Sequence, residues 1–123
     1  MTLAPADYAT LNRAIADLRS WDARDALKVG GRRNAMIARV ADNLERIATA
    51  DEAHELPAVL AHYPYAEDLG FFEYAVIQSG FAGLEDAREA RLAAVALLKR
   101  LRVEAIRTGR TTHDPGLNNG GTP

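Results

Sequence analysis

The sequence predicts an all-α protein, a compact bundle of about five helices, and three observations support this fold class. Apolar residues recur at spacings of three and four in most segments of the chain. Glycine, proline and acidic residues stand where helices are expected to begin or end. No strand-length run alternates between apolar and polar residues. The chain has 123 residues, 48% of them hydrophobic, so we expect one domain over residues 1–110 that is long enough to bury a core.

The first helix is expected over about residues 5–20. Pro5 suits the first turn of a helix because its missing N–H is not needed there. The apolar stripe of this helix consists of Tyr8, Leu11, Ile15 and Leu18. Residues 22–29 leave two alternatives open. They form either a short capped helix that Gly30 ends or a turn followed by an extended segment.

The second helix is expected from Arg32 to about Thr49, and a short helix follows it. The apolar stripe of the second helix consists of Met36, Ile37, Val40, Leu44 and Ile47. Asp51 is a candidate cap for the short helix, which tolerates Pro57 only near its beginning.

Two longer helices complete the predicted bundle. Glu67 and Asp68 favour a helix N-terminus, and Gly80 is expected to end that helix. Apolar residues surround its axis on nearly every side, which predicts that this helix is the buried spine of the core. The last helix is expected over about residues 84–108. We expect the Gly/Asn/Thr/Pro-rich residues 111–123 to form a disordered tail.

Composition argues against several functional classes. The chain has no cysteine, which excludes disulfides and thiolate chemistry. Residues 1–17 carry Asp7 and Arg13 and have no long apolar centre, so we expect no signal peptide. No run of 18 apolar residues occurs, so we expect no membrane partner and a cytoplasmic location. His54 and His62 lack the spacing of a metal site, and Ser20 and Ser79 have no histidine nearby in the sequence. We therefore expect no enzyme, no metal and no cofactor.

Charge is unevenly distributed along a chain whose net charge is −2. Residues 13–46 carry eight basic and five acidic side chains, whereas residues 47–90 carry nine acidic side chains and one basic. Residues 91–110 are basic again, with six basic side chains and one acidic. Such a chain could meet an acidic partner at either end or pair with itself.

The run from Leu27 to Val40 combines turn residues, positive charge and helical periodicity. Gly30 and Gly31 precede Arg32 and Arg33, and an apolar, helix-periodic segment follows them. From residue 18 to residue 40 the chain resembles the SAP family of small DNA-binding modules. Its apolar positions are matched by Leu18, Trp21, Leu27, Val29, Met36, Ile37 and Val40.

In the same resemblance, Gly31 matches the turn glycine of the family, and Arg32 and Arg33 match its basic pair. Asp22 and Ala26 depart from the pattern, which prefers leucine and glycine there. The resemblance implies a helix, a short extended turn and a second, basic helix within residues 5–48, and it implies DNA binding.

Elementary physics supports an anion site at the same place. A helix N-terminus has unpaired N–H groups and a partial positive charge, which suit phosphate. The sequence predicts that Arg19, Lys28, Gly31, Arg32 and Arg33 bind the phosphates of DNA or RNA. The alternative is that the two glycines form an ordinary turn between helices and the arginines are simply solvated.

Two other functions remain open at this point. The wide apolar stripe of the last helix, together with the opposite charges of the blocks, favours a protein–protein module, for instance a homodimer. A small-molecule pocket is the other possibility, suggested by an aromatic cluster that would otherwise be core. This cluster comprises Tyr63, Tyr65, Phe71, Phe72, Tyr74 and Phe81.

Overall fold

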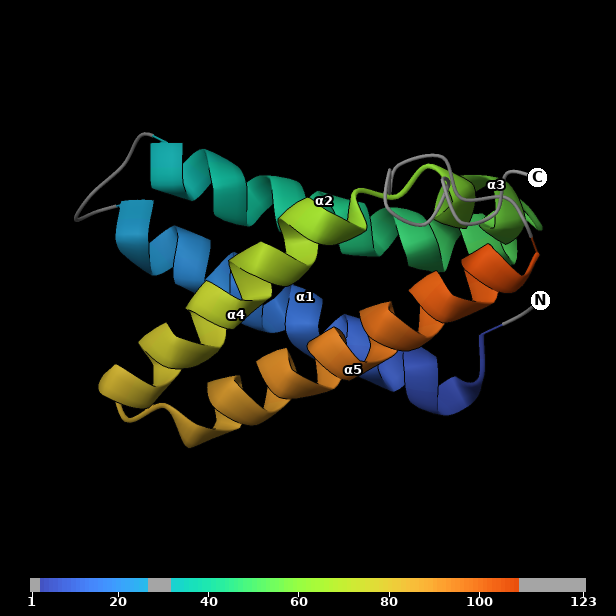
Figure 1. Cartoon of the computed structure of the whole chain (residues 1–123). Helices are drawn as coiled ribbons and strands as arrows, with labels where there is room; N and C mark the ends of the chain where they lie inside the picture. The colour runs from blue at the N-terminus through green and yellow to red at the C-terminus, as the bar shows by residue number, and fades with distance from the viewer. Residues whose placement is uncertain (1–2, 27–31, 109–123) are drawn as a thin grey trace.

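The computed structural model describes residues 3–26 and 32–108 and is helical nearly throughout them (Figure 1). The helices are α1 (Pro5–Ala26), α2 (Arg32–Glu52), α3 (Leu56–Ala61), α4 (Tyr65–Phe81) and α5 (Glu85–Arg107). The described residues contain no strand, so the predicted all-α bundle of about five helices is confirmed. The predicted tail, residues 111–123, lies outside the described part of the chain. None of the described helices is both long and apolar enough to cross a membrane.

Two helical hairpins form the bundle. α1 packs mainly against α2, and α4 packs mainly against α5. The hairpins are joined chiefly through α1 and α5, while the short α3 contacts α2 and α5. In Figure 1 the α4–α5 hairpin, yellow to orange, lies in front of the blue and green α1–α2 hairpin.

The core lies between the two hairpins and contains most of the predicted stripe residues, although Met36, predicted in the stripe of α2, is 39% exposed. Buried side chains include Leu11, Leu18, Ile37, Val40, Leu44, Ile47, Leu56, Leu60, Phe72, Leu98 and Leu101. Tyr8 and Ile15 are partly buried and pack against the same cluster. Full burial of one such large apolar side chain stabilises a fold by about 1.5–3 kcal/mol.

α1 does not end near residue 20 but continues to Ala26. Trp21 explains the extension, because its indole is buried against Phe71 and Tyr74 of α4 with ring centroids 5.8 and 6.3 Å away. Residues 22–26 therefore form neither a separate capped helix nor a turn. The rest of the ambiguous segment lies outside the described residues.

Asp51 does not cap the short helix, because α2 runs past it to Glu52. Its carboxylate instead accepts hydrogen bonds from the Leu3 amide, at 3.1 Å, and from the Tyr8 hydroxyl. A capping pattern considers only neighbouring residues, so it could not predict this contact with residues more than 40 positions away. It fastens the start of the chain to the end of α2.

α2 and α4 end in the same kind of hydrogen-bonded turn, but the left-handed residue is a histidine after α2 and a glycine after α4. At the end of α4, the Leu84 amide donates to the Ser79 carbonyl at 2.9 Å, and Gly83 adopts φ +69°. At the end of α2, the Glu55 amide donates to the Ala50 carbonyl at 2.7 Å, and His54 adopts φ 60°. Both are Schellman turns with a left-handed residue, so Gly83 rather than Gly80 ends α4.

The prediction that α4 is buried on nearly every side is wrong. Leu69, Phe72 and Ala75 face the core, but Ile77 is 58% exposed and Phe81 is 86% exposed. α4 packs on α5, reaches α1 through Trp21 and contacts α2 through Asp68, while its side with Ile77 and Phe81 stays exposed. The helix thus has two apolar faces, of which one is exposed in the single chain.

Candidate functional site

Of the residues predicted to bind nucleic acid, Arg19 is the one whose side chain the structure describes. Its guanidinium donates to Asp42 at 2.6 Å and to Glu45 at 3.0 Å, both on α2. The hydrogen bonds with Asp42 and Glu45 raise the pKa of Arg19. A phosphate approaching Arg19 would therefore have to compete with two carboxylates of the chain itself.

The remaining predicted residues are placed only in part. Arg32 and Arg33 are the first two residues of α2, whose first turn holds no acidic side chain. Their side chains, and Lys28 and Gly31 entirely, lie outside the described residues. Close to this helix start, the Asn34 amide donates to the Asp22 carbonyl at 3.2 Å and so joins α2 to α1.

A different surface is fully described and stands out by its chemistry. Gly70, Tyr74, Ile77 and Phe81 follow one another along α4 at spacings of four, three and four, so they share one side of the helix. Tyr74 is 43% exposed, and Met36 of α2, which is 39% exposed, lies near Gly70 and Tyr74. We call these five residues the α4 surface.

The α4 surface has a hollow at one end and a protruding ring at the other. The hollow has a volume of about 500 Å³ and is lined by Met36, Arg39, Glu67, Gly70, Phe71 and Tyr74. A Cβ atom added at Gly70 would meet no atom within 4 Å, so the space beside this glycine in the wall of the hollow is open. Arg39 and Glu67, 3.9 Å apart, place a charged pair at its edge. The protruding ring is that of Phe81.

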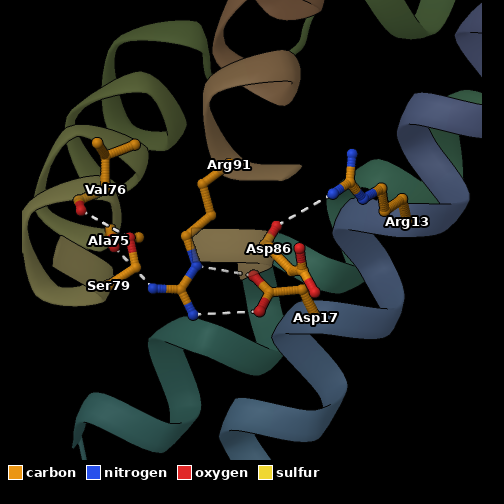
Figure 2. Close-up of polar contacts among 7 residues, drawn as sticks. All are labelled: Arg13, Asp17, Ala75, Val76, Ser79, Asp86 and Arg91. Atoms are coloured by element: carbon orange, nitrogen blue, oxygen red, sulfur yellow. Dashed lines mark hydrogen bonds and ion pairs between the residues drawn. The ribbon is translucent and has the colours of Figure 1, made fainter. Parts of the chain in front are cut away.

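A buried ion pair contacts α4 on the side that faces the core (Figure 2). Arg91 of α5 is 1% exposed and donates from Nε to Asp17 of α1 at 2.7 Å. A second nitrogen donates to the other Asp17 oxygen at 3.2 Å, and the third donates to the Ala75 carbonyl of α4 at 2.7 Å. The guanidinium also stacks on Trp21, 4.4 Å from the ring centroid. One side chain therefore holds α1, α4 and α5 together behind the α4 surface.

Asp68 forms a second buried polar cluster, beneath the start of α4. Its carboxylate accepts hydrogen bonds from the Tyr63 hydroxyl at 2.5 Å and from the Asn43 amide at 3.1 Å. Burial raises the pKa of Asp68, although both hydrogen bonds act in the opposite direction. Burial also raises the pKa of Tyr63 well above its usual value. Because Asp68 is fully buried, the cluster serves to join α2, α4 and the segment before α4.

The predicted aromatic cluster does not surround one cavity. Tyr63, Tyr65, Phe71 and Phe72 are buried in the core, whereas Tyr74 and Phe81 belong to the α4 surface. Another hollow, of about 640 Å³, lies between α2 and α3. It is lined mainly by exposed side chains: Arg46, His54, Glu55, Pro57, Ala58, Val59, His62 and Tyr63.

Sequence reasoning missed both the α4 surface and Arg91. The spacing of Gly70, Tyr74, Ile77 and Phe81 was present in the sequence, but nothing local shows which side of an apolar helix is covered. Arg91 stands at an apolar position of its helix, one turn before Ala94 and two before Leu98. A basic residue inside a buried stripe is the signal that could have predicted a buried pair.

Comparison of the chain with protein-family models, with curated proteins and with solved structures finds no match. The resemblance of residues 18–40 to the SAP family therefore stays a prediction.

Proposed function

We propose that the chain is a non-enzymatic helical module that acts through protein–protein contact, with the α4 surface as its binding face. The observation that carries the proposal is that α4 has a second apolar side that is exposed. Its most exposed residue is Phe81, at 86%. A helix that is apolar on nearly every side is normally buried. Contiguous exposed apolar patches with charged edges mark contact sites.

Burial of this surface against a partner would contribute several kcal/mol of binding free energy. Burying one aromatic or large aliphatic side chain contributes about 1.5–3 kcal/mol, and the α4 surface offers Tyr74, Ile77 and Phe81. The Arg91–Asp17 pair and the packing of Trp21 hold the helix in place before any partner arrives. A rigid surface loses little conformational entropy on binding, so more of the gain appears as affinity.

Site-specific photo-crosslinking tests the proposal. A benzophenone amino acid replaces Ile77 in the full chain, expressed in the cells in which the chain naturally occurs, and a control variant carries it at the exposed Asn12 of α1. We expect a covalent protein adduct from position 77 and none from position 12. Absence of any adduct at position 77, in a folded variant, would contradict the proposal.

Nucleic-acid binding is a second candidate function, favoured by one observation. Arg32 and Arg33 open α2 in a first turn that contains no acidic residue, where backbone N–H groups and the helix dipole attract anions. Because Arg19 is engaged with Asp42 and Glu45, we assign the phosphate contacts mainly to Arg32, Arg33 and Lys28. The two functions are compatible, since many duplex-binding proteins are dimers.

Binding of a fluorescent duplex at two salt concentrations tests this candidate. Affinity should fall steeply with salt, and the slope should decrease by about 0.9 for each phosphate contact removed. Changing Arg32 and Arg33 to Ala should therefore weaken binding and flatten the salt dependence. Arg46→Ala, on the same helix but far from its start, is the control and should bind as the wild type does. Binding that is absent, or unchanged in the double variant, would overturn this candidate.

A further inference from the structure

We infer that the partner of the α4 surface is a second copy of this chain, with Phe81 of each copy seated in the hollow at Gly70 of the other. The inference rests on the proposed function, because both require the α4 surface to be a contact surface. It adds the identity of the partner and the way in which the two surfaces fit.

The first reason is that the hollow and the protruding ring lie on the same side of one helix. Gly70 and Phe81 are eleven residues apart, which is about three helical turns and roughly 16 Å along the axis. Most of the wall of the hollow is apolar, and Met36, Phe71 and Tyr74 form this part of it. The space beside Gly70 is open, because this residue has no side chain and no atom lies within 4 Å of the position that a Cβ would take.

The second reason is symmetry. A twofold axis that meets α4 between Gly70 and Phe81 exchanges the two positions, so each hollow receives a ring and each ring enters a hollow. In that antiparallel arrangement Tyr74 of one copy faces Ile77 of the other. Such an interface closes on itself after two copies and leaves no further ring or hollow free. The chain thus carries both halves of the contact.

The third reason is the distribution of charge. None of the four positions that α4 contributes to this surface is charged, so an antiparallel pairing places no charge in the centre of the contact, and the exposed Glu73 stays at its flank. The Arg39–Glu67 pair lies at the edge of the hollow, where a contact between proteins normally keeps its polar groups. Gly70 further permits close approach of the two helix backbones.

Sedimentation of the full chain over the micromolar range tests the inference with three variants. The wild type should be a dimer. Phe81→Asp should weaken dimerisation by about 30-fold or more, as expected when a central aromatic residue is lost. Leu92→Asp is the matched control: Leu92 is also an exposed apolar helix residue, 42% exposed on α5, and its variant should remain dimeric.

Gly70→Leu separates association from folding. Leucine has ample room in the single chain and favours helix more than glycine does, so the variant should melt no lower than the wild type. The same side chain fills the hollow, so the variant should be monomeric. A monomeric Gly70→Leu chain with an undiminished melting temperature cannot be explained by loss of fold.

Mixing the two defective variants gives the sharpest result. A Phe81→Asp chain keeps its hollow and a Gly70→Leu chain keeps its ring, so a mixed pair retains one of the two contacts. We expect the mixture to form heterodimers more strongly than either variant forms homodimers. Failure of the mixture to associate more strongly than either variant would overturn the reciprocal arrangement.

The outcomes also separate this inference from the proposed function. A monomeric wild type whose position 77 crosslinks to a different protein overturns the inference and leaves the proposed function standing. A monomeric wild type without any adduct overturns both. A dimer that Leu92→Asp disrupts and Phe81→Asp does not would place the interface on α5 and overturn the inference.

Discussion

Asp17 of α1 and Arg91 of α5 form a bidentate ion pair, with nitrogen–oxygen distances of 2.7 and 3.2 Å, in a nearly water-free position behind α4. The pair lies where three helices meet, and the third guanidinium nitrogen donates to a backbone carbonyl of α4. Each of the three nitrogens of this guanidinium thus donates a hydrogen bond to a residue of another helix. The exposed side of α4 depends on this arrangement for its position.

Replacing Asp17 by Ala should destabilise the fold strongly. The substitution leaves the Arg91 charge buried without its carboxylate, and breaking a buried pair in this way typically costs about 3–5 kcal/mol. Urea unfolding followed by circular dichroism measures the change. Glu89→Ala is the control, because it removes an exposed pair with Arg13 at 3.5 Å and should cost at most about 1 kcal/mol. Equal losses in the two variants would contradict the role assigned to Arg91.

Replacing His54 by Gly should stabilise the fold. His54 adopts φ 60°, a left-handed conformation that costs an ordinary residue about 1–2 kcal/mol relative to glycine. Part of that gain is lost because glycine gives the unfolded chain more freedom, so we expect a net increase of about 0.5–1 kcal/mol in the free energy of unfolding.

The equivalent turn after α4 provides the reverse test for this prediction. Gly83 adopts φ +69°, and Gly83→Ala should lower the free energy of unfolding by about 1 kcal/mol. Thermal unfolding of both variants measures the two changes. A destabilised His54→Gly chain would mean that the imidazole makes a contribution larger than the backbone strain.

Asp68 should make stability depend on pH in an unusual direction. Burial raises the pKa of its carboxyl above the value it has in the unfolded chain. The folded chain then holds the proton more tightly, so the contribution of Asp68 to stability is greatest below the unfolded pKa. It decreases as the pH rises through the folded pKa.

The test compares the wild type with Asp68→Asn, which cannot titrate. The free energy of unfolding of the wild type, relative to this variant, should decrease as the pH rises from about 4, near the ordinary Asp value. Asp42→Asn, at an exposed position, controls for the general effect of removing one charge. A difference between wild type and Asp68→Asn that is constant with pH would contradict the raised pKa.

Periodicity predicted most of the fold because it reports a property that each helix carries in itself. The stripes through Leu11 and Leu18 and through Val40 and Leu44 were predicted correctly and are buried. Helix ends were predicted less well, since a capping side chain can instead form a hydrogen bond with a residue that is distant in the sequence. Asp51 binds Tyr8 rather than the next helix, and Gly80 lies inside α4 because the left-handed turn occurs at Gly83.

The candidate site could not be predicted, for a physical reason. Sequence shows that α4 is apolar on nearly every side, but only the arrangement of α1 and α5 decides that Phe72 is covered and Phe81 is not. Arg19 likewise shows that the partners of a side chain cannot be read from its neighbours in the sequence. Its charge was predicted to meet phosphate, yet Asp42 and Glu45, distant in sequence, are its observed partners.

The molar mass of the unmodified chain in dilute solution shows whether the chain associates with itself. If two copies cover each other's α4 surface, sedimentation equilibrium should give twice the chain mass of 13.4 kDa, falling towards a single chain only on dilution. A mass of one chain that persists to high micromolar concentration would contradict this association.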